Sequence, residues 1–331
     1  MNLNCNEIND FPTAPANKRG WPWTNDSAIE SPVASDTKAW PKISIVTPSF
    51  NQGQFLEETI RSVLLQNYPN LEYIIIDGGS TDNSVDIIKK YSRWLSYWVS
   101  EKDNGQAHAI NKGLERCTGE IFNWINSDDY LTAGALKIIA KNIENFDAVA
   151  GAVMNFDNTS EAVIQSSELY VKKMIKGDVT VIYQQPGTWV RTEKLRRLGG
   201  LKEDFHFCFD WFMLIGYLNM YPKISYVTDT LVKFRLHKES KTLKHGSEFR
   251  REILKISHEL MYLEEYRLKY YSEAIKCAQR YLWIEEIDRL KVNSHSGFYK
   301  SQSILSAMVG NIFSYPYRYA LGTIRNIIFG L

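Results

Sequence analysis

Between residues 41 and 147, short hydrophobic runs alternate with segments whose hydrophobic residues recur at helical spacing. Runs rich in β-branched residues, which indicate strands, lie at 42–50, 71–77, 97–101 and 120–129. Segments with apolar residues at helical spacing lie at 51–66, 84–95, 105–117 and 132–146. Strand and helix therefore alternate, and we expect Pro48 to end the first strand. This order predicts an α/β fold with a mostly parallel sheet and helices on both faces.

Beyond residue 147 the alternation loosens. We expect strands at 147–156 and 224–237, a short helix closed by glycines at 192–200, and an apolar helix at 210–220. Residues 247–290 are charged, with apolar residues at a period of 3.6. This part of the chain predicts a C-terminal helical extension.

The first 40 residues are polar and rich in Pro, Asn, Asp and Ser, which predicts an irregular arm. The stretch "GWPWT" at 20–24 is the exception, and we expect its two tryptophans to dock on the domain that follows. A binding role is a second interpretation. The predicted boundaries are an arm over 1–40, a domain over 41–245 with halves 41–130 and 131–245, and a helical region over 246–331.

Composition favours a soluble globular protein, because 44% of the 331 residues are hydrophobic and 23% are charged. The net charge of +1 gives no reason to expect a nucleic-acid partner. The four cysteines are scattered without a CxxC spacing, which favours reduced thiols in a cytoplasmic protein. The chain begins without a basic region followed by an apolar run, so we expect no signal peptide.

Segment 301–331 contains no acid and only two bases, Arg318 and Arg325, among many apolar residues. Such a segment can lie in a membrane interface. Docking on the core or on a partner subunit explains the composition equally well. Peripheral attachment at the inner face of the plasma membrane is therefore one of two open interpretations.

Polar loops follow three of the predicted strands, at 47–52, 77–82 and 126–129. In an open parallel sheet, ligands bind outside the carboxyl ends of the strands. Asp77 ends its strand directly and can accept hydrogen bonds from a nucleobase or a ribose, or it can simply form a turn and helix cap. No GxGxxG or GxxxxGK[ST] motif occurs at these ends, which weakens dehydrogenase and P-loop interpretations.

The stretches "PKISIVTPSFNQGQFLEETIRSVLLQNYPNLEYIIIDGGSTDNS" and "VSEKDNGQAHAINKGLERCTGEIFNWINSDD" resemble glycosyltransferase family 2. The resemblance runs from about Pro41 to about Lys241. It implies a GT-A fold and an inverting transfer from a nucleotide-diphosphate sugar. The halves 41–130 and 131–245 would then form the nucleotide-binding and acceptor halves of a catalytic domain.

The resemblance also assigns residues to the donor nucleotide. Asp77 would bind the base, commonly uracil, and His108 would face the diphosphate, solvent or the core. The other implied contacts are Thr47, Pro48 and Phe50 at the nucleobase and Asp103 and Asn111 at the nucleoside or phosphates. Lys112, like His108, would face the diphosphate, solvent or the core.

The family's Asp-x-Asp element here reads Asn126-Ser127-Asp128. The resemblance makes Asp128 the ligand of Mg²⁺ or Mn²⁺, while the amide of Asn126 would still bond the ribose. Asp129 is expected to cap the next helix or to support the loop. His237 matches a histidine near the metal or diphosphate, and Ser240 and Lys241 would bind phosphate oxygens.

Asp210 is the implied catalytic base, in a segment where family members carry an acidic pair before an aromatic residue. Here Phe209 replaces the first acid, and Phe212 replaces another frequent acid. Such apolar neighbours favour a raised pKa of Asp210. The alternative is that Asp210 caps a helix. Gln184 and Gln185 stand where acceptor hydroxyls would be recognised.

The sequence thus predicts a metal-dependent inverting glycosyltransferase, with a UDP-sugar favoured as donor and a saccharide or lipid-linked saccharide as acceptor. The family setting is bacterial polysaccharide or O-antigen assembly. One alternative is a nucleotidyltransferase of similar fold, but "TPSFNQGQ" lacks the basic residues expected after its first strand. The other is a non-catalytic sugar-nucleotide or glycan-binding protein, against which Asp128, Asp210 and His237 argue.

Overall fold

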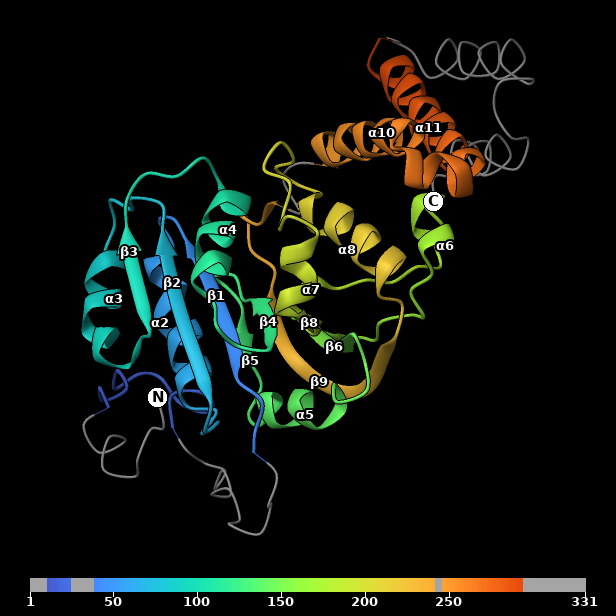
Figure 1. Cartoon of the computed structure of the whole chain (residues 1–331). Coiled ribbons are helices and arrows are strands. Elements are labelled where there is room, and N and C mark those ends of the chain that lie inside the picture. The colour runs from blue at the N-terminus through green and yellow to red at the C-terminus, as the bar shows by residue number, and fades with distance from the viewer. Residues whose placement is uncertain (1–10, 25–38, 242–245, 294–331) are drawn as a thin grey trace. The chain divides into compact units, whose positions relative to one another are not determined.

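A computed structural model describes residues 11–24, 39–241 and 246–293 of the chain, with side chains up to residue 285 (Figure 1). The chain divides into two compact units. The first comprises 1–169 and 180–244, and the second comprises 170–179 and 245–331. The candidate site lies in the first unit.

The first unit begins with strands and helices that alternate. They are β1 (Ile43–Ser49), α2 (Gly53–Leu64), β2 (Leu71–Asp77), α3 (Ser84–Tyr91), β3 (Tyr97–Ser100), α4 (Gln106–Arg116) and β4 (Ile121–Trp124). The later elements are β5 (Tyr130–Leu131), α5 (Ala135–Asn142), β6 (Ala148–Phe156), β7 (Glu161–Ile164), β8 (Thr188–Arg191), α7 (Thr192–Arg197), α8 (Phe209–Met220) and β9 (Ile224–Arg235).

The nine strands found among the described residues join one sheet, in the order β3-β2-β1-β4-β8-β6-β9-β5, with β7 paired to β6. The pairs β1–β2, β2–β3, β1–β4 and β6–β9 are parallel. The pairs β4–β8, β6–β8, β6–β7 and β5–β9 are antiparallel. The predicted α/β class is therefore confirmed, but the sheet is mixed, because β5, β7 and β8 run against their neighbours.

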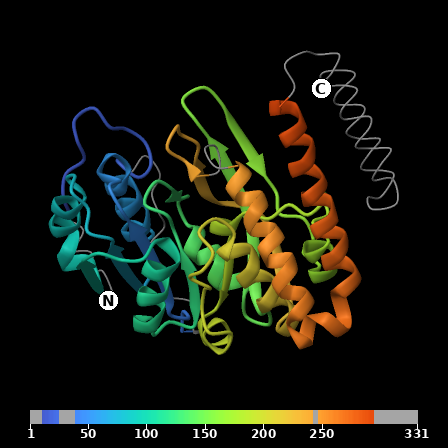
Figure 2. The ribbon, with the colours of Figure 1, turned by 90° about the horizontal axis from the view of Figure 1, so that it is seen from above.

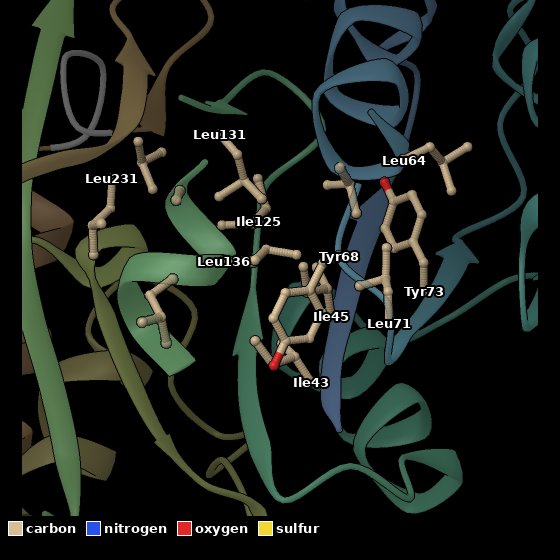
Figure 3. Close-up of a cluster of buried hydrophobic side chains, with 14 of the residues drawn as sticks. Ile43, Ile45, Leu64, Tyr68, Leu71, Tyr73, Ile125, Leu131, Leu136 and Leu231 are labelled. Atoms are coloured by element: carbon tan, nitrogen blue, oxygen red, sulfur yellow. The ribbon is translucent and has the colours of Figure 1, made fainter. Parts of the chain in front are cut away.

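The core on one sheet face comes from alternate strand residues such as Ile43 and Ile45, which are fully buried (Figure 3). Helices α2, α3 and α5 cover this face with apolar residues at helical spacing. Each buried Ile or Leu stabilises the fold by about 1.5–3 kcal/mol. Helix α4 covers the opposite face so closely that a Cβ on Gly113 would lie 2.5 Å from Val46. The prediction of helices on both faces is thus confirmed (Figure 1).

Two predicted strand ends were wrong, and both corrections concern the candidate site. The run 120–129 leaves the ladder after Trp124, and Asp129 N donates to Asn126 O at 3.1 Å, so residues 126–129 form a turn. Strand β1 continues past Pro48 to Ser49. It can do so because β4 ends opposite Val46, which leaves no β4 acceptor facing the proline nitrogen.

The described part of the second unit contains α6 (Val171–Ile175), α10 (Gly246–Tyr262) and α11 (Glu264–Asn293). Helices α10 and α11 lie side by side in both views (Figure 2). The predicted helices within 247–290 are confirmed, whereas segment 301–331 lies outside the described residues. No helix in the part of the chain that the structure describes is long and apolar enough to cross a membrane.

Candidate active site

The carboxyl ends of β1, β2 and β4 meet at one edge of the sheet, because these strands are parallel. Strand β9 ends at this edge too, since it is parallel to β6 and β6 runs antiparallel to β8, which itself opposes β4. The turn 126–129 and the segment 235–241 are therefore neighbours. Side chains more than a hundred positions apart in sequence meet here.

Asp128 and His237 are in direct contact. The imidazole Nε2 of His237 lies 2.9 Å from Oδ2 of Asp128, and the two side chains are 14% and 21% exposed. The ring of His237 packs against Phe55, with centroids 4.8 Å apart. His237 N donates to Ser240 Oγ at 3.0 Å, so Ser240 holds the turn that carries the imidazole.

This pair offers one carboxylate and one imidazole to a divalent cation, which are donor types that suit Mg²⁺ or Mn²⁺. Within the described residues, no group of three or more His, Cys, Asp or Glu side chains is arranged to hold a metal ion. A cation here would take its remaining ligands from phosphate oxygens and water, as Mg²⁺ usually does. The residues present therefore fit a metal that binds together with a nucleotide.

Asp129 is 1% exposed and points into the protein. Its Oδ1 accepts from Arg235 N at 3.0 Å, and its Oδ2 accepts from Asn126 Nδ2 at 3.2 Å. Burial and the neighbouring Asp128 carboxylate raise the pKa of Asp129 well above its usual range. The capping prediction for Asp129 was wrong, because α5 begins after Gly134 without a side-chain cap. Asp129 supports the loop instead.

A chain of polar side chains runs along the turn. Lys241 Nζ donates to Gln106 Oε1 at 2.9 Å, and Gln106 Nε2 donates to Asn126 Oδ1 at 2.7 Å. Since Asn126 also donates to Asp129, both ends of its amide have protein partners. Ser127 is 4% exposed, and its carbonyl accepts from Thr59 on α2 at 3.0 Å. Residues 126–129 are thus fixed from several sides.

Asp77 is completely buried at the end of β2. Its Oδ1 accepts from Ser80 Oγ at 2.6 Å, and its Oδ2 accepts from Gly79 N, Ser80 N and Ser100 Oγ at 3.2, 2.9 and 2.7 Å. Three of these four donors meet Oδ2 and one meets Oδ1, so Asp77 shapes the loop after β2. Its expected contact with the nucleobase stays a prediction.

Asp103 lies against that loop, and a Cβ added to Gly78 would come within 2.7 Å of its Oδ2. Its Oδ1 accepts from Gly105 N at 2.8 Å. At the end of β1, Thr47 is buried with its hydroxyl 3.0 Å from Tyr73 OH, and Pro48 is also buried. The ring of Phe50 is 59% exposed and remains available to a base.

Three predicted residues on α4 have structural partners. Asn111 donates to Leu201 O and accepts from Leu201 N, at 2.8 and 2.9 Å. His108 Nδ1 accepts from Asn104 N at 3.1 Å, and Lys112 forms an ion pair with Glu101. Asn111 thus anchors the 200–203 loop and Lys112 pairs with Glu101, while their expected nucleotide contacts stay predictions.

Asp210 is the second residue of α8, and its Oδ1 accepts from Trp211 N at 2.8 Å. Cys208 occupies the N-cap position, so Asp210 lies inside the first turn. Phe209 stacks near Trp124 with ring centroids 6.1 Å apart, which brings the start of α8 to the end of β4. Burial and the charge of Asp210 raise the pKa of Tyr183 well above its usual range.

Gln185 sits beside the same strand end. Its Nε2 donates to Asn123 Oδ1 at 2.9 Å and to Trp124 O at 3.1 Å. The backbone carbonyl of Gln184 accepts from Gly187 N at 3.2 Å. The amide nitrogen of Gln185 therefore braces the end of β4, and recognition of acceptor hydroxyls by Gln184 and Gln185 stays a prediction.

The sequence profile of Glycosyl transferase family 2 matches residues 44–216. The chain belongs to this family. Among its relatives, TuaG of Bacillus subtilis, named for teichuronic acid biosynthesis, is 39% identical over 27% of this chain and 36% of its own length. The glycosyltransferase GlyG of Streptococcus pneumoniae is 32% identical over 35% of this chain and 40% of its own length. The family 2 chain thus matches less than half of either relative.

Two solved structures share the fold of this family 2 chain. TarS 1–349 of S. aureus with UDP-GlcNAc has a TM-score of 0.56 at 18% identity, covering 73% of this chain and 71% of TarS. The mannosyltransferase PcManGT of Pyrobaculum calidifontis with GDP-Man and Mn²⁺ has a TM-score of 0.53 at 16% identity. That match covers 89% of this chain and 91% of PcManGT, and it confirms the predicted GT-A fold.

Sequence reasoning missed Arg235, Gln106 and Glu58. Arg235 Nε donates to Asp128 O at 3.0 Å, and its Nη2 donates to Glu58 Oε2 at 2.6 Å. The only sequence signal for Arg235 is its position two residues before His237. Gln106 and Glu58 give no signal, because each acts through a partner that lies far away in the chain.

Proposed function

We propose that this family 2 chain is a metal-dependent inverting glycosyltransferase that moves a sugar from a nucleotide diphosphate, UDP favoured, to a saccharide acceptor. The observation that carries the proposal is the contact between Asp128 and His237 at the edge where the parallel strands end. A carboxylate and an imidazole from two distant segments converge there, beside the ends of the strands where ligands bind.

In this proposal Asp128 and His237 hold Mn²⁺ or Mg²⁺. When bound, the cation supplies positive charge to the departing diphosphate. Lys241, whose ammonium lies at the end of the polar chain through Gln106, adds a further positive charge beside the phosphates. Asn126 bonds the ribose through its amide once the nucleotide arrives.

Asp210 takes the proton of the acceptor hydroxyl as that oxygen attacks the anomeric carbon. The new carbon–oxygen bond forms while the bond to the diphosphate breaks, and its electron pair leaves with the diphosphate. A single displacement of this kind inverts the anomeric configuration. The placement of Asp210 in the first turn of α8, near the end of β4, supports this assignment.

The exposed ring of Phe50 and the carboxylate of Asp103 are proposed to contact the nucleoside, in a loop shaped by Asp77. The two similar structures are complexes with nucleotide-diphosphate sugars, TarS with UDP-GlcNAc and PcManGT with GDP-Man and Mn²⁺. The name of TuaG supports a role in cell-surface polysaccharide assembly. A lipid-linked acceptor stays a prediction, and so does peripheral membrane contact, which was expected through segment 301–331.

A thermal-shift screen with UDP-, GDP- and dTDP-sugars in Mn²⁺ tests the proposal. A bound ligand at 100 times its Kd stabilises a protein by about 2.7 kcal/mol. We expect Mn²⁺-dependent stabilisation, largest with UDP-sugars, that is lost in Asp128→Ala. Slow hydrolysis should release a nucleoside diphosphate. Release of pyrophosphate from a nucleoside triphosphate incubated with a sugar phosphate would indicate a nucleotidyltransferase, and stabilisation without any turnover would indicate a binding protein.

A further inference from the structure

Residues 11–24, hereafter the N-terminal segment, are bound to α2 by a buried arginine. Arg61 is 4% exposed, and its guanidinium donates to Pro12 O, Pro22 O and Trp23 O at 2.7, 3.2 and 3.5 Å. The same group lies over the rings of Phe11 and Trp23, 5.0 and 5.3 Å from their centroids. A buried cation needs such partners, so the N-terminal segment is part of the folded domain.

One turn earlier on α2, Glu58 joins this segment to the candidate site. Trp23 Nε1 donates to Glu58 Oε1 at 3.1 Å, while Arg235 Nη2 donates to Glu58 Oε2 at 2.6 Å. The carboxylate thus has one oxygen on the N-terminal segment and the other on the end of β9. The side chains of Arg235 and Glu58 are only 17% and 16% exposed, so solvent weakens their attraction little.

Arg235 carries the connection to the loop 126–129. Its Nε donates to Asp128 O at 3.0 Å, and its backbone N donates to Asp129 Oδ1 at 3.0 Å. The guanidinium is held among three aromatic rings, those of Phe55, Tyr130 and Phe156, at 4.8, 5.7 and 4.6 Å. Arg235 therefore has little freedom to move once Glu58 is fixed.

A second bond reaches the other side of the same loop. Trp21 Nε1 donates to Leu131 O at 2.7 Å, two residues beyond Asp129. The two tryptophans of "GWPWT" thus act on the loop from both directions, Trp23 through Glu58 and Arg235, and Trp21 directly.

We propose that the N-terminal segment is a positioning element for loop 126–129, with Trp23, Glu58 and Arg235 as its connection to Asp128. The proposal rests on the proposed function for its catalytic consequence. The positioning of the loop does not depend on the proposed function, since the hydrogen bonds of Arg235 end on the loop itself. Catalytic groups must be held near their productive geometry by neighbours that are themselves fixed, which is the task that these residues perform.

The test compares Trp23→Phe, which keeps an aromatic ring but removes the N–H, with Trp40→Phe, whose ring packs against Tyr68 at 5.6 Å. Hydrogen exchange is followed at Ile125, Asp129 and Leu131, whose amides donate to Val46 O, Asn126 O and Ser62 Oγ. We expect about fivefold faster exchange in Trp23→Phe than in Trp40→Phe, as for a loss of about one hydrogen bond. Equal exchange in the two variants would overturn the proposal.

Two further measurements separate positioning from general stability. The Mn²⁺ concentration for half-maximal UDP binding, measured by calorimetry well below the Tm of each variant, should rise about fivefold in Trp23→Phe and stay unchanged in Trp40→Phe. In a Glu58→Gln background, Trp23→Phe should raise this Mn²⁺ concentration little further, because the connection from Trp23 through Glu58 to Arg235 is already broken. If Trp23→Phe fails to fold, Trp21→Phe, which removes the hydrogen bond to Leu131 O, replaces it as the test variant. If the wild-type chain binds no nucleotide, the proposed function fails, and hydrogen exchange alone decides the role of the segment.

Discussion

The imidazole Nε2 of His237 lies 2.9 Å from Oδ2 of Asp128, although 109 positions separate the two residues in the chain. Strand β9 makes this contact possible. It runs alongside β6 and ends at Arg235, so His237 follows the strand end at the edge where β4 delivers Asp128. The pair brings a carboxylate and an imidazole together at the edge where β1, β2 and β4 end.

His237→Gln is the first prediction. Glutamine retains a polar group of similar reach but lacks the imidazole nitrogen. We expect the Mn²⁺ concentration for half-maximal nucleotide binding to rise at least tenfold, the lower end of the loss seen when metal-site residues are changed. His108→Gln is the matched control, because His108 accepts from Asn104 on α4. The same Mn²⁺ dependence in both variants would remove His237 from the metal site.

Asp210→Asn tests the base. Asparagine is nearly the same size but cannot take up the acceptor proton, so kcat should fall about 10²- to 10⁴-fold. The Kd of UDP with Mn²⁺ should stay unchanged, since Asp210 lies on the acceptor side. Asp204→Asn, an exposed acid six residues earlier, should leave kcat unaffected. A normal kcat in Asp210→Asn would require another base.

Much of the fold follows from local patterns. The strand 71–77 and the helix 106–116 match their predicted ranges closely, because the first is a short, continuously buried β-branched run and the second buries residues at helical spacing. The predicted range 120–129 was too long, because the apolar start of the strand continues into a polar turn. The hydrogen bond from Asp129 N to Asn126 O closes this turn.

The hydrogen-bond partners of the candidate site residues could not be predicted, because many of them lie far away in the sequence. Asp77 is strongly polar at a strand end, yet Ser80 and Ser100 occupy its carboxylate. Asn111 is bound to Leu201 across 90 positions. Family resemblance located the region of the site well, but which polar atoms face a ligand is decided by contacts between distant segments.

Glu72 provides a prediction about stability. Its carboxylate accepts from Lys42 Nζ, Ser44 Oγ, Thr118 N and Thr118 Oγ1, at 2.8, 2.6, 2.6 and 2.7 Å. Burial would raise the pKa of Glu72, but these hydrogen bonds lower it to about 2. The stabilisation is therefore complete above the unfolded pKa, near 4.5, and is lost as pH falls toward 2.

Glu72→Gln should reduce the free energy of unfolding by about 1.5–3 kcal/mol at pH 7, the range for hydrogen bonds to a charged group. Urea unfolding should give the same difference at pH 5 and a smaller one near pH 3. Glu101→Gln, which removes an exposed partner of Lys112, should show no measurable change. A pH-independent difference for Glu72→Gln would mean that its charge is not involved.

Asn126→Asp tests the amide in the turn. Asn126 Nδ2 donates to the buried carboxylate of Asp129, so an aspartate would replace a donor with a like charge beside Asp128 and Asp129. We expect the free energy of unfolding in urea without metal to fall by about 1–3 kcal/mol, the cost of leaving a buried acceptor unsatisfied. Asn104→Asp, at an exposed position, is the matched control. If both variants unfold at the wild-type midpoint and Asn126→Asp also keeps the wild-type UDP affinity, the amide does not support Asp129.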